Sequence, residues 1–397
     1  MSDPSTGPWL TIIGIGEDGL AGLSEASRNA LAQAETVYGG ERHLKLAGVD
    51  GRGKPWPVPF DAACVLARRG HPTAVLASGD PFWHGAGGNL VRHLSPDEWV
   101  AHPSPSTFSL VASRLGWQLE TTICIGLHAA PFERLVPLLS RGARIICLLR
   151  DANAAADLAP WLTTRGWGAS RLWTLSALGG PREHMTEGRA NSYAVDTAAS
   201  PLALAIEADG TEGLSRASGL ADDLFKHDGQ ITKRPVRALA LSALAPRPGE
   251  KLWDIGAGSG SISVEWALAG GTATAIEARD DRAGNIRANA AAFGLAHKIS
   301  VVAGTAPAAL SSLEKPDAVF IGGGLDAAMF DAIWSLVPAT TRIVAHSVTL
   351  ETEALLSDLQ QKHGGEMLRI EIAHAAPLGR YRSWEASRPV VQWSVVK

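Results

Sequence analysis

Three glycines at alternate positions, followed by an acidic residue at the end of the next apolar run, form the pattern in this chain that most clearly implies ligand chemistry. Gly256, Gly258 and Gly260 lie in the segment LWDIGAGSGSISVEWA, and Glu277 ends the run TATAIE. Glycine is needed where a backbone turns sharply and a ligand approaches it closely. A carboxylate at the end of a second strand can accept hydrogen bonds from both hydroxyls of a ribose. The pair predicts a nucleoside-binding crevice at the carboxyl ends of parallel strands.

The glycine spacing distinguishes between two kinds of nucleoside site. A dinucleotide-binding loop reads GxGxxG, whereas this chain reads GxGxG, with Ser261 where the third glycine of that fingerprint would stand. GxGxG is the spacing of class I S-adenosylmethionine (SAM) methyltransferases. An ordinary strand-to-helix turn in another Rossmann-like domain is the alternative. The cofactor-binding candidates of this half also include Thr232, Asp254, Gly304 and Gly322.

The C-terminal half alternates between strand-like and helix-like runs. Five βα units are followed by the runs 368–373 and 390–396, and the interval between these two is too irregular for a crossover helix. A closing antiparallel hairpin is therefore expected there. Together these elements predict a doubly wound, Rossmann-like sheet of seven strands, as in class I SAM methyltransferases.

The N-terminal half is also α/β, with a different glycine loop. An apolar run enters the segment GIGEDG, which contributes Gly14 and Gly16, and a second buried run ends at the Gly79-Asp80-Pro81 turn. Turns at the carboxyl ends of strands are where ligands bind. Either Ser106 or Thr107 is expected to cap the helix that follows. These residues, Gly14, Gly16, Gly79, Asp80, Ser106 and Thr107, are the cofactor-binding candidates of the first half.

A polar, glycine-bearing segment without periodicity, EADGTEGLSRASG, follows the apolar run PLALAI. It is the best linker in the chain, and we place the boundary near Gly210. The chain is thus expected to hold two different α/β domains, at 1–210 and 211–397.

Composition narrows the possible functions. The chain has 397 residues and a net charge of −4 without a basic block, which argues against nucleic acid as a partner. It has no apolar run of about 18 residues and no signal peptide, so we expect a cytoplasmic protein without a membrane span. The three cysteines have no metal-ligand spacing, and no metal site is expected.

Taken together, the motifs resemble a family of the cobalamin pathway, the bifunctional precorrin methyltransferases that also decarboxylate their substrate. The first half is similar to tetrapyrrole methylase domains, which have two α/β lobes, through GIGEDG, YGGERHL, SGDPFWHGAG and PSPSTFSLVASRLGW. The second half is similar to the decarboxylating methyltransferase partner through FKHDGQITKRPVRALALSAL, GAGSG, IEA, VFIGGG and SVTLET. The chain departs from the usual motifs at Glu17, where many tetrapyrrole methylases have proline, and at His346, where asparagine is expected.

The resemblance implies an activity for each half. Residues 1–210 would methylate carbon 5 of a reduced, anionic precorrin macrocycle, and residues 211–397 would methylate carbon 15 and decarboxylate the ring C acetate, giving precorrin-8. Each domain would bind one SAM. We also expect a homo-oligomer.

Charged residues ahead of the second glycine loop are the candidates for substrate contacts. A polycarboxylate substrate calls for Arg and Lys at the mouth of the crevice. Lys233 and Arg237 are four residues apart, which would place both on one face of a helix that begins near Thr232. Asp228 could manage a proton or cap that helix. The alternative is that the residues of this cluster are solvated surface charges and not substrate contacts. The same two interpretations apply to Arg42 in the first half.

Two other functions fit parts of the pattern. A SAM methyltransferase acting on nucleic acid or protein would share the glycine loop, but the fourth strand of this domain ends in IGGG, without the Asn/Asp-Pro-Pro-aromatic motif that holds a flipped base or an amide. A binding protein that has lost its activity would not need an intact set of three loop glycines with Glu277.

Overall fold

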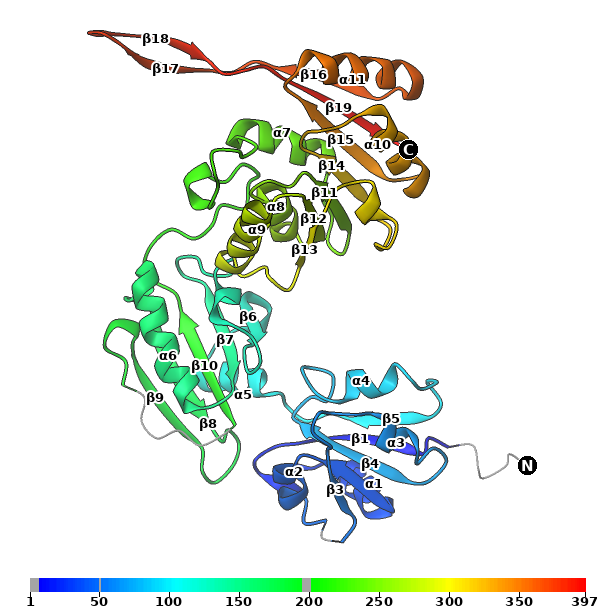
Figure 1. Ribbon diagram of the computed structural model, residues 1–397. Coiled ribbons are helices and arrows are strands. Elements are labelled where there is room, and N and C mark those ends of the chain that lie inside the picture. Colours follow the sequence, from blue (N-terminus) through cyan, green and yellow to red (C-terminus); the bar gives the residue numbers. More distant parts are fainter. Residues whose placement is uncertain (1–6, 50, 195–200) are drawn as a thin grey trace. The chain divides into compact units, whose positions relative to one another are not determined.

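The computed structural model describes residues 7–49, 51–194 and 201–397 (Figure 1). The chain divides into two compact units. The first comprises Met1–Ala130 and Ser140–Glu212, and the second comprises Gly213–Lys397 together with the short segment Pro131–Leu139. This segment lies within the first unit in sequence but belongs to the second unit in the structure. No local sequence pattern indicates this assignment.

The first sheet of the first unit is parallel. Within the described part of this unit, its strands are ordered β3-β2-β4-β1-β5. β1 and β4 are central and read as almost continuous apolar runs because both of their faces are buried. The strands are β1 (Leu10–Ile15), β2 (Thr36–Gly39), β3 (Gly53–Pro55), β4 (Thr73–Ser78) and β5 (Trp99–His102), and the helices are α1 (Glu25–Gln33), α2 (Glu41–Leu46), α3 (Ala63–Leu66) and α4 (Gly87–Val91).

The second sheet of this unit is mixed. Its described strands are ordered β6-β7-β10-β8-β9, and the β6–β7 pair is parallel while the other pairs are antiparallel. Its elements are β6 (Thr122–Gly126), β7 (Arg144–Leu149), β8 (Arg171–Ser176), β9 (His184–Arg189), β10 (Leu202–Glu207), α5 (Thr107–Leu115) and α6 (Ala152–Leu162). Two sheets in one unit agree with the two α/β lobes that the resemblance implies.

The second unit contains the predicted seven-stranded sheet, and all of its residues are described. The strand order is β13-β12-β11-β14-β15-β19-β16, parallel from β13 to β15, with β19 antiparallel to both of its neighbours. The strands are β11 (Lys251–Ile255), β12 (Thr272–Glu277), β13 (Ile299–Ala303), β14 (Ala318–Ile321), β15 (Arg342–Ser347), β16 (Glu366–Ile370) and β19 (Val390–Val396). The sheet changes winding direction between β11 and β14.

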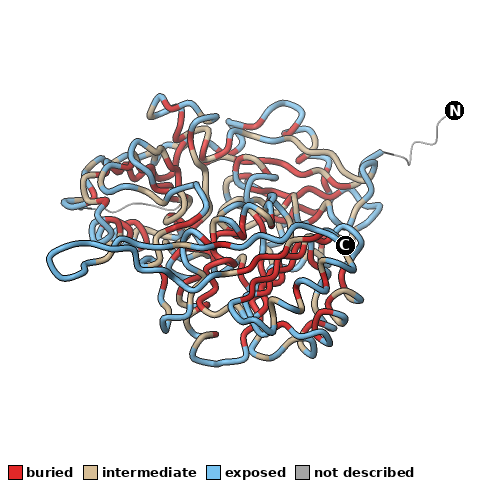
Figure 2. The backbone as a smooth tube through the Cα atoms, turned by 90° about the horizontal axis from the view of Figure 1, so that it is seen from above, coloured by how far each residue is buried: buried red, intermediate tan, exposed pale blue. Residues whose placement is uncertain are grey.

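Helices cover both faces of this sheet. Figure 2 shows the buried residues of the chain in red. α7, α8 and α9 pack on one face, and α10 and α11 pack on the other. Their bounds are α7 (Arg234–Leu244), α8 (Ser261–Leu268), α9 (Asp280–Ala292), α10 (Ala327–Leu336) and α11 (Leu350–His363). No described helix of the chain is both apolar enough and long enough to cross a membrane.

The interval before the last strand differs from the prediction. β16 and β19 pair as expected, but the residues between them form a further antiparallel hairpin, β17 (Ala373–Leu378) and β18 (Tyr381–Ala386). Nearly every residue of this hairpin is exposed, and it extends away from the seven-stranded sheet as an arm (Figure 1). Its sequence contains Pro377 and no regular alternation, so local pattern could not separate it from an irregular loop.

Candidate active sites

The carboxyl ends of β11, β12 and β14 surround the glycine loop of the second unit. Gly256, Gly258 and Gly260 have φ angles of +67°, +59° and +73°, in the left-handed region that other residues enter at a cost. A methyl group on Gly260 would also lie 2.8 Å from the side chain of Ile286 on α9. The three predicted glycines are therefore required by the turn itself and by its packing.

Glu277 ends β12 and directs its carboxylate into this loop. Its side chain is buried, Oε2 accepts a hydrogen bond from the Gly258 amide at 2.9 Å, and Oε1 accepts one from the Arg279 amide at 3.0 Å. Each carboxylate oxygen has a second lone pair, so the group retains acceptor capacity toward a ligand. This is the geometry needed to receive ribose hydroxyls beside the glycine loop.

Asp254 lies at the center of the sheet, just before the loop. Its Oδ2 accepts hydrogen bonds from the Ser263 hydroxyl at 2.6 Å and the Ser263 amide at 3.2 Å, whereas Oδ1 is buried without a partner. Burial raises the pKa of Asp254 to about 6, although the Ser263 hydrogen bonds lower it. A buried carboxylate oxygen without a partner beside a nucleoside crevice is suited to a cationic ligand group.

The remaining candidates of the second unit lie around the same crevice. The Gly304 amide donates to the Glu277 carbonyl at 3.0 Å, and a methyl group on Gly322 would lie 3.1 Å from the Gly256 carbonyl oxygen. Thr232 lies just before α7, and its carbonyl accepts a hydrogen bond at 2.5 Å from Arg237. The residues present thus fit SAM: Glu277 would hold the ribose beside the glycine loop, and the buried Asp254 carboxylate would support that loop from below.

The prediction that Lys233 and Arg237 share one exposed face of a helix is wrong. α7 begins at Arg234, with Lys233 as its N-cap residue in an extended conformation and proline in its first turn. Lys233 is exposed and stays available to a ligand. Arg237 is completely buried, so it cannot lie at the mouth of the crevice.

Arg237 instead forms the center of a buried ion-pair network. Its guanidinium contacts Glu265 at 2.6 Å and Asp222 at 3.0 Å, donates to the Leu220 carbonyl, and stacks on the Phe225 ring at 4.8 Å. The Glu265 carboxylate also accepts hydrogen bonds from the backbone amides of residues 219 and 220. Arg237 therefore connects the segment that precedes α7 to Glu265 on α8.

Asp228 does not cap α7. It is exposed, its Oδ1 accepts a hydrogen bond from the Gln230 amide at 3.0 Å, and its Oδ2 pairs with Arg282 at 2.9 Å. The Gln230 amide and the Arg282 guanidinium lower the pKa of Asp228. The group is accordingly ionised at neutral pH, which makes it a poor proton donor there.

Sequence reasoning missed Asn289, a buried residue of α9. Its side chain bonds both the amide (2.8 Å) and the carbonyl (2.9 Å) of Lys226 and donates to the carbonyl of Ser259 in the glycine loop (2.8 Å). Asn289 thus joins the segment before α7 to the SAM crevice. A buried amide in an otherwise Ala-rich helix, ANAAA, is the one signal that could have indicated it.

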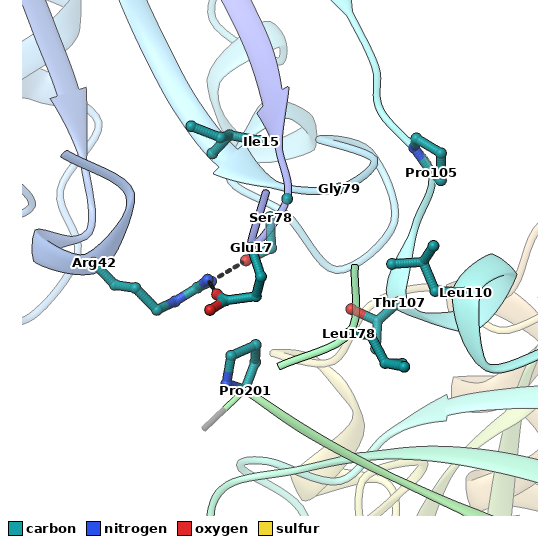
Figure 3. A pocket seen from close by; sticks show the side chains of 11 residues that line it. Ile15, Glu17, Arg42, Ser78, Gly79, Pro105, Thr107, Leu110, Leu178 and Pro201 are labelled. Carbon is teal, nitrogen blue, oxygen red and sulfur yellow. Dashed lines mark hydrogen bonds and ion pairs between the residues drawn. The ribbon is translucent and has the colours of Figure 1, made fainter. Parts of the chain in front are cut away.

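The first unit contains an open pocket at the carboxyl ends of β1 and β4 (Figure 3). Three of the predicted residues, Gly16, Gly79 and Thr107, line it. Gly14, Asp80 and Ser106 do not line it and have structural contacts instead. A methyl group on Gly14 would collide with the Gly79 carbonyl, Asp80 accepts a hydrogen bond from the Phe82 amide, and Ser106 caps α5.

The sequence indicated Arg42 but not the charged network to which it belongs on the wall of this pocket. Glu17 is buried and pairs with Arg42, which donates to the Ser78 hydroxyl at 2.8 Å and to His43 Nε2 at 2.7 Å. Burial and the nearby Arg42 charge lower the pKa of His43 to about 4, so its ring is neutral at physiological pH. The described residues contain no cluster of three or more His, Cys, Asp or Glu side chains placed to hold a metal ion.

The fold and the glycine-loop site of the second unit define a class I SAM-dependent methyltransferase domain. Two protein families match the chain: Tetrapyrrole (Corrin/Porphyrin) Methylases over residues 9–194 and Precorrin methyltransferase domain over residues 223–397. A precorrin-6Y C(5,15)-methyltransferase (decarboxylating) from Sinorhizobium sp is 46% identical over 100% of this chain and 98% of its own length. The chain therefore belongs to the precorrin-6Y C(5,15)-methyltransferase (decarboxylating) family and is a SAM-dependent methyltransferase.

Two further relatives are shorter than this chain. A probable cobalt-precorrin-6B C(15)-methyltransferase (decarboxylating) from Pyrobaculum calidifontis is 36% identical over 43% of this chain and 92% of its own. The crystal structure of the C-terminal domain of precorrin-6Y C5,15-methyltransferase from Rhodobacter capsulatus is 57% identical, covers 46% of this chain and 100% of its own, and has a TM-score of 0.46.

The buried carboxylate of Asp254 generates a prediction about pH. Because its pKa is raised from 3.8 to about 6, the unfolded chain ionises first as pH rises, and the native protein loses stability between about pH 4 and pH 6. A pKa that is higher by about two in the native protein lowers the free energy of unfolding by about 3 kcal/mol above pH 6. Asp254→Asn should therefore stabilise the SAM-free protein at pH 7 relative to wild type, and the gain should vanish near pH 4, as measured by urea unfolding at both pH values.

The matched control for this experiment is Asp281→Asn. Asp281 is exposed, and its pairing with Arg279 lowers its pKa, so removing its charge should give no such gain at pH 7. An effect of Asp254→Asn that is the same at pH 4 and pH 7 would contradict the role assigned to the buried charge.

The network around Arg237 generates a second prediction. Arg237→Met would leave Glu265 buried without its counter-charge, so the free energy of unfolding of the second unit should fall by about 3–5 kcal/mol. Arg234→Met, on the exposed first residue of the same helix, should change it by less than about 0.5 kcal/mol. Chemical denaturation of both variants measures the difference, and equal stabilities would contradict the stabilising role assigned to the Arg237–Glu265 pair.

Proposed function

We propose that this chain methylates precorrin-6Y at carbons 5 and 15 and removes the carboxylate of the ring C acetate as carbon dioxide, giving precorrin-8. The names of its full-length relatives support both the substrate and the reactions. The observation that carries the proposal is the Glu277 carboxylate directed into the Gly258 loop, which provides a nucleoside site at the switch point of the sheet.

The methylation requires alignment of the two reacting groups more than covalent catalysis by the protein. SAM supplies a methyl group on a positively charged sulfur. A bridging carbon of the reduced macrocycle is already nucleophilic, so the protein has to hold it in line with that methyl group. When carbon dioxide leaves, the electron pair of the broken carbon–carbon bond stays on the substrate and can delocalise into the conjugated, protonatable macrocycle. A proton from solvent then takes the place of the carboxylate, so no further cofactor is required.

The two activities divide between the two units in this proposal. The first unit methylates carbon 5, and the second methylates carbon 15 and decarboxylates. The C(15)-methyltransferase (decarboxylating) relative from Pyrobaculum calidifontis supports the division, because its match covers 43% of this chain, about the size of one unit. Each unit binds one SAM, in the pocket of the first unit and beside the glycine loop of the second.

The substrate contacts of the second unit need revision from the sequence prediction. Lys233 remains the candidate for holding a substrate carboxylate, since it is exposed at the start of α7 beside the glycine loop. Arg237 supports the segment that carries it and has no free donor role in our proposal. Asp228 acts as a partner of Arg282 rather than as a proton carrier.

We also propose a homo-oligomer in the cytoplasm. A two-stranded hairpin with no further strands is marginally stable in water, and the β17–β18 arm exposes Leu378, Tyr381 and Trp384. Burying these side chains against a second copy would stabilise the arm.

The cytoplasmic location rests on the cysteines. Three free thiols, Cys64, Cys124 and Cys147, suit a reducing compartment.

Binding stoichiometry tests the two SAM sites. Isothermal titration calorimetry of the full chain should give close to two SAM per chain. Glu277→Ala should reduce this to one, because the first unit keeps its own pocket. A wild-type value of one would contradict a site in each unit.

Product analysis tests the division of labour. Incubation of the Glu277→Ala chain with precorrin-6Y and ¹³C-methyl SAM should give a product methylated at carbon 5 alone, with its carboxylate retained, as read by ¹³C NMR and mass. Wild type should add both methyl groups and lose carbon dioxide. Normal decarboxylation by the variant would show that the second unit does not perform that step.

A further inference from the structure

A buried carboxylate in the pocket of the first unit, Glu17, pairs with two arginines, of which Arg42 lines the pocket and Arg182 lies next to it. Glu17 directly follows β1, and its side chain is only 5% exposed. Arg42 comes from α2 next to the first sheet, and its guanidinium points at Glu17 and Ser78 (Figure 3). Arg182 comes from the loop after β8 of the second sheet, and its Nη2 lies 3.1 Å from Glu17 Oε2. Glu17 is thus the common anchor of both cations.

The loop that carries Arg182 is fixed against Glu17. A methyl group on Gly180 would lie 2.5 Å from the Glu17 Cβ, so the two backbones are in close contact. At the end of the loop, Glu183 accepts a hydrogen bond from the Gly179 amide at 2.7 Å and forms a two-bond ion pair with Arg114 at 2.5 and 2.9 Å. The position of Arg182 is therefore set by ordered backbone on both sides.

The charges of this network do not cancel. Two arginines share one carboxylate, and the neighbouring His43 contributes no charge at neutral pH because its pKa is lowered. The buried member is the anion, whereas the Arg42 and Arg182 side chains are 32% and 62% exposed. A guanidinium has five N–H donors, so donors of both arginines remain for a ligand at the pocket.

We propose that Arg42 and Arg182, oriented by the buried Glu17, form a carboxylate-binding pair that selects and positions the polyanionic substrate of the first unit. This inference rests on the proposed function, in which that unit methylates carbon 5 of a tetrapyrrole. The planar guanidinium binds a carboxylate through two parallel hydrogen bonds, which determines orientation as well as affinity. Because Arg42 lies on α2 beside the first sheet and Arg182 lies in a loop of the second sheet, a substrate that engages both is held in one orientation beside Glu17.

The test measures carbon-5 methylation of precorrin-6Y by the full chain with ¹³C-methyl SAM, so that the two methyl positions are resolved by NMR. Arg182→Gln should raise the KM for precorrin-6Y roughly tenfold, the effect of losing a charged hydrogen bond, while kcat and the SAM dissociation constant stay within about twofold. Arg182→Lys, which keeps the charge without the planar fork, should recover part of the loss. Arg42→Gln should behave like Arg182→Gln.

Arg171→Gln is the matched control. Arg171 lies at the other end of β8, is also exposed, and also pairs with carboxylates, Glu187 and Glu207. Its loss should leave the KM for precorrin-6Y unchanged. If the loss of any surface charge were responsible, Arg171→Gln would raise the KM for precorrin-6Y as much as Arg182→Gln does. That result would overturn the proposal.

Glu17→Gln tests the positioning role, because it keeps the shape of the side chain but removes the charge that holds both arginines. KM should rise about threefold or more, and Glu17→Asp should restore part of the loss, with kcat little changed. A merely structural role would lower the melting temperature and leave the KM of the folded enzyme at the wild-type value.

The outcomes separate the two proposals. If the unaltered chain does not methylate carbon 5, the proposed function fails, and this inference fails with it. If the unaltered chain methylates carbon 5 and the Arg42, Arg182 and Glu17 variants keep the wild-type KM, the proposed function stands and the carboxylate-binding pair is overturned.

Discussion

Both sites depend on backbone segments that approach each other closely at the carboxyl ends of parallel strands. In the first unit, a side chain at Gly14 would collide with the carbonyl of Gly79, so β1 and the turn after β4 can meet only without one. In the second unit, Gly260 allows the loop to pack on Ile286 of α9. Parallel strands bring these turns to one edge of the sheet, and glycine leaves room there for a ligand. The same constraint thus shapes the glycine turns at the strand ends of two unrelated sheets.

Buried carboxylates then organise the surroundings of each site in different ways. Glu265 is paired with a completely buried Arg237, which closes the network and makes it structural. Glu17 is paired with arginines whose side chains reach solvent, which leaves cationic groups beside the pocket. Glu277 and Asp254 keep unused acceptor capacity at the glycine loop and beneath it. An ion pair whose arginine is buried supports the fold. An ion pair whose arginines are exposed leaves their remaining donors accessible at the surface.

Much of the second unit could be predicted because its signals are local. The strand-like runs, the alternating glycines and the acidic end of β12 each lie within a few residues, and the order of strands follows from the rules for βα units. The hairpin β17–β18 could not be predicted, since strand pairing there depends on register and not on a regular apolar pattern. Of the two expected caps, Ser106 rather than Thr107 caps α5, a local effect that sequence can indicate because a cap acts on the next turn of the chain.

The sequence by itself determined where the turns and strand ends lie, because glycine, proline and short apolar runs restrict the backbone locally. Only the tertiary structure decided which charges are buried. Arg237 meets Glu265, 28 residues further along the chain, and Arg182 meets Glu17, 165 residues away. A charged residue carries no local sign of the partner that it will meet. The direction of such a side chain is settled when the sheets and helices pack, and with it the difference between a supporting ion pair and a ligand contact.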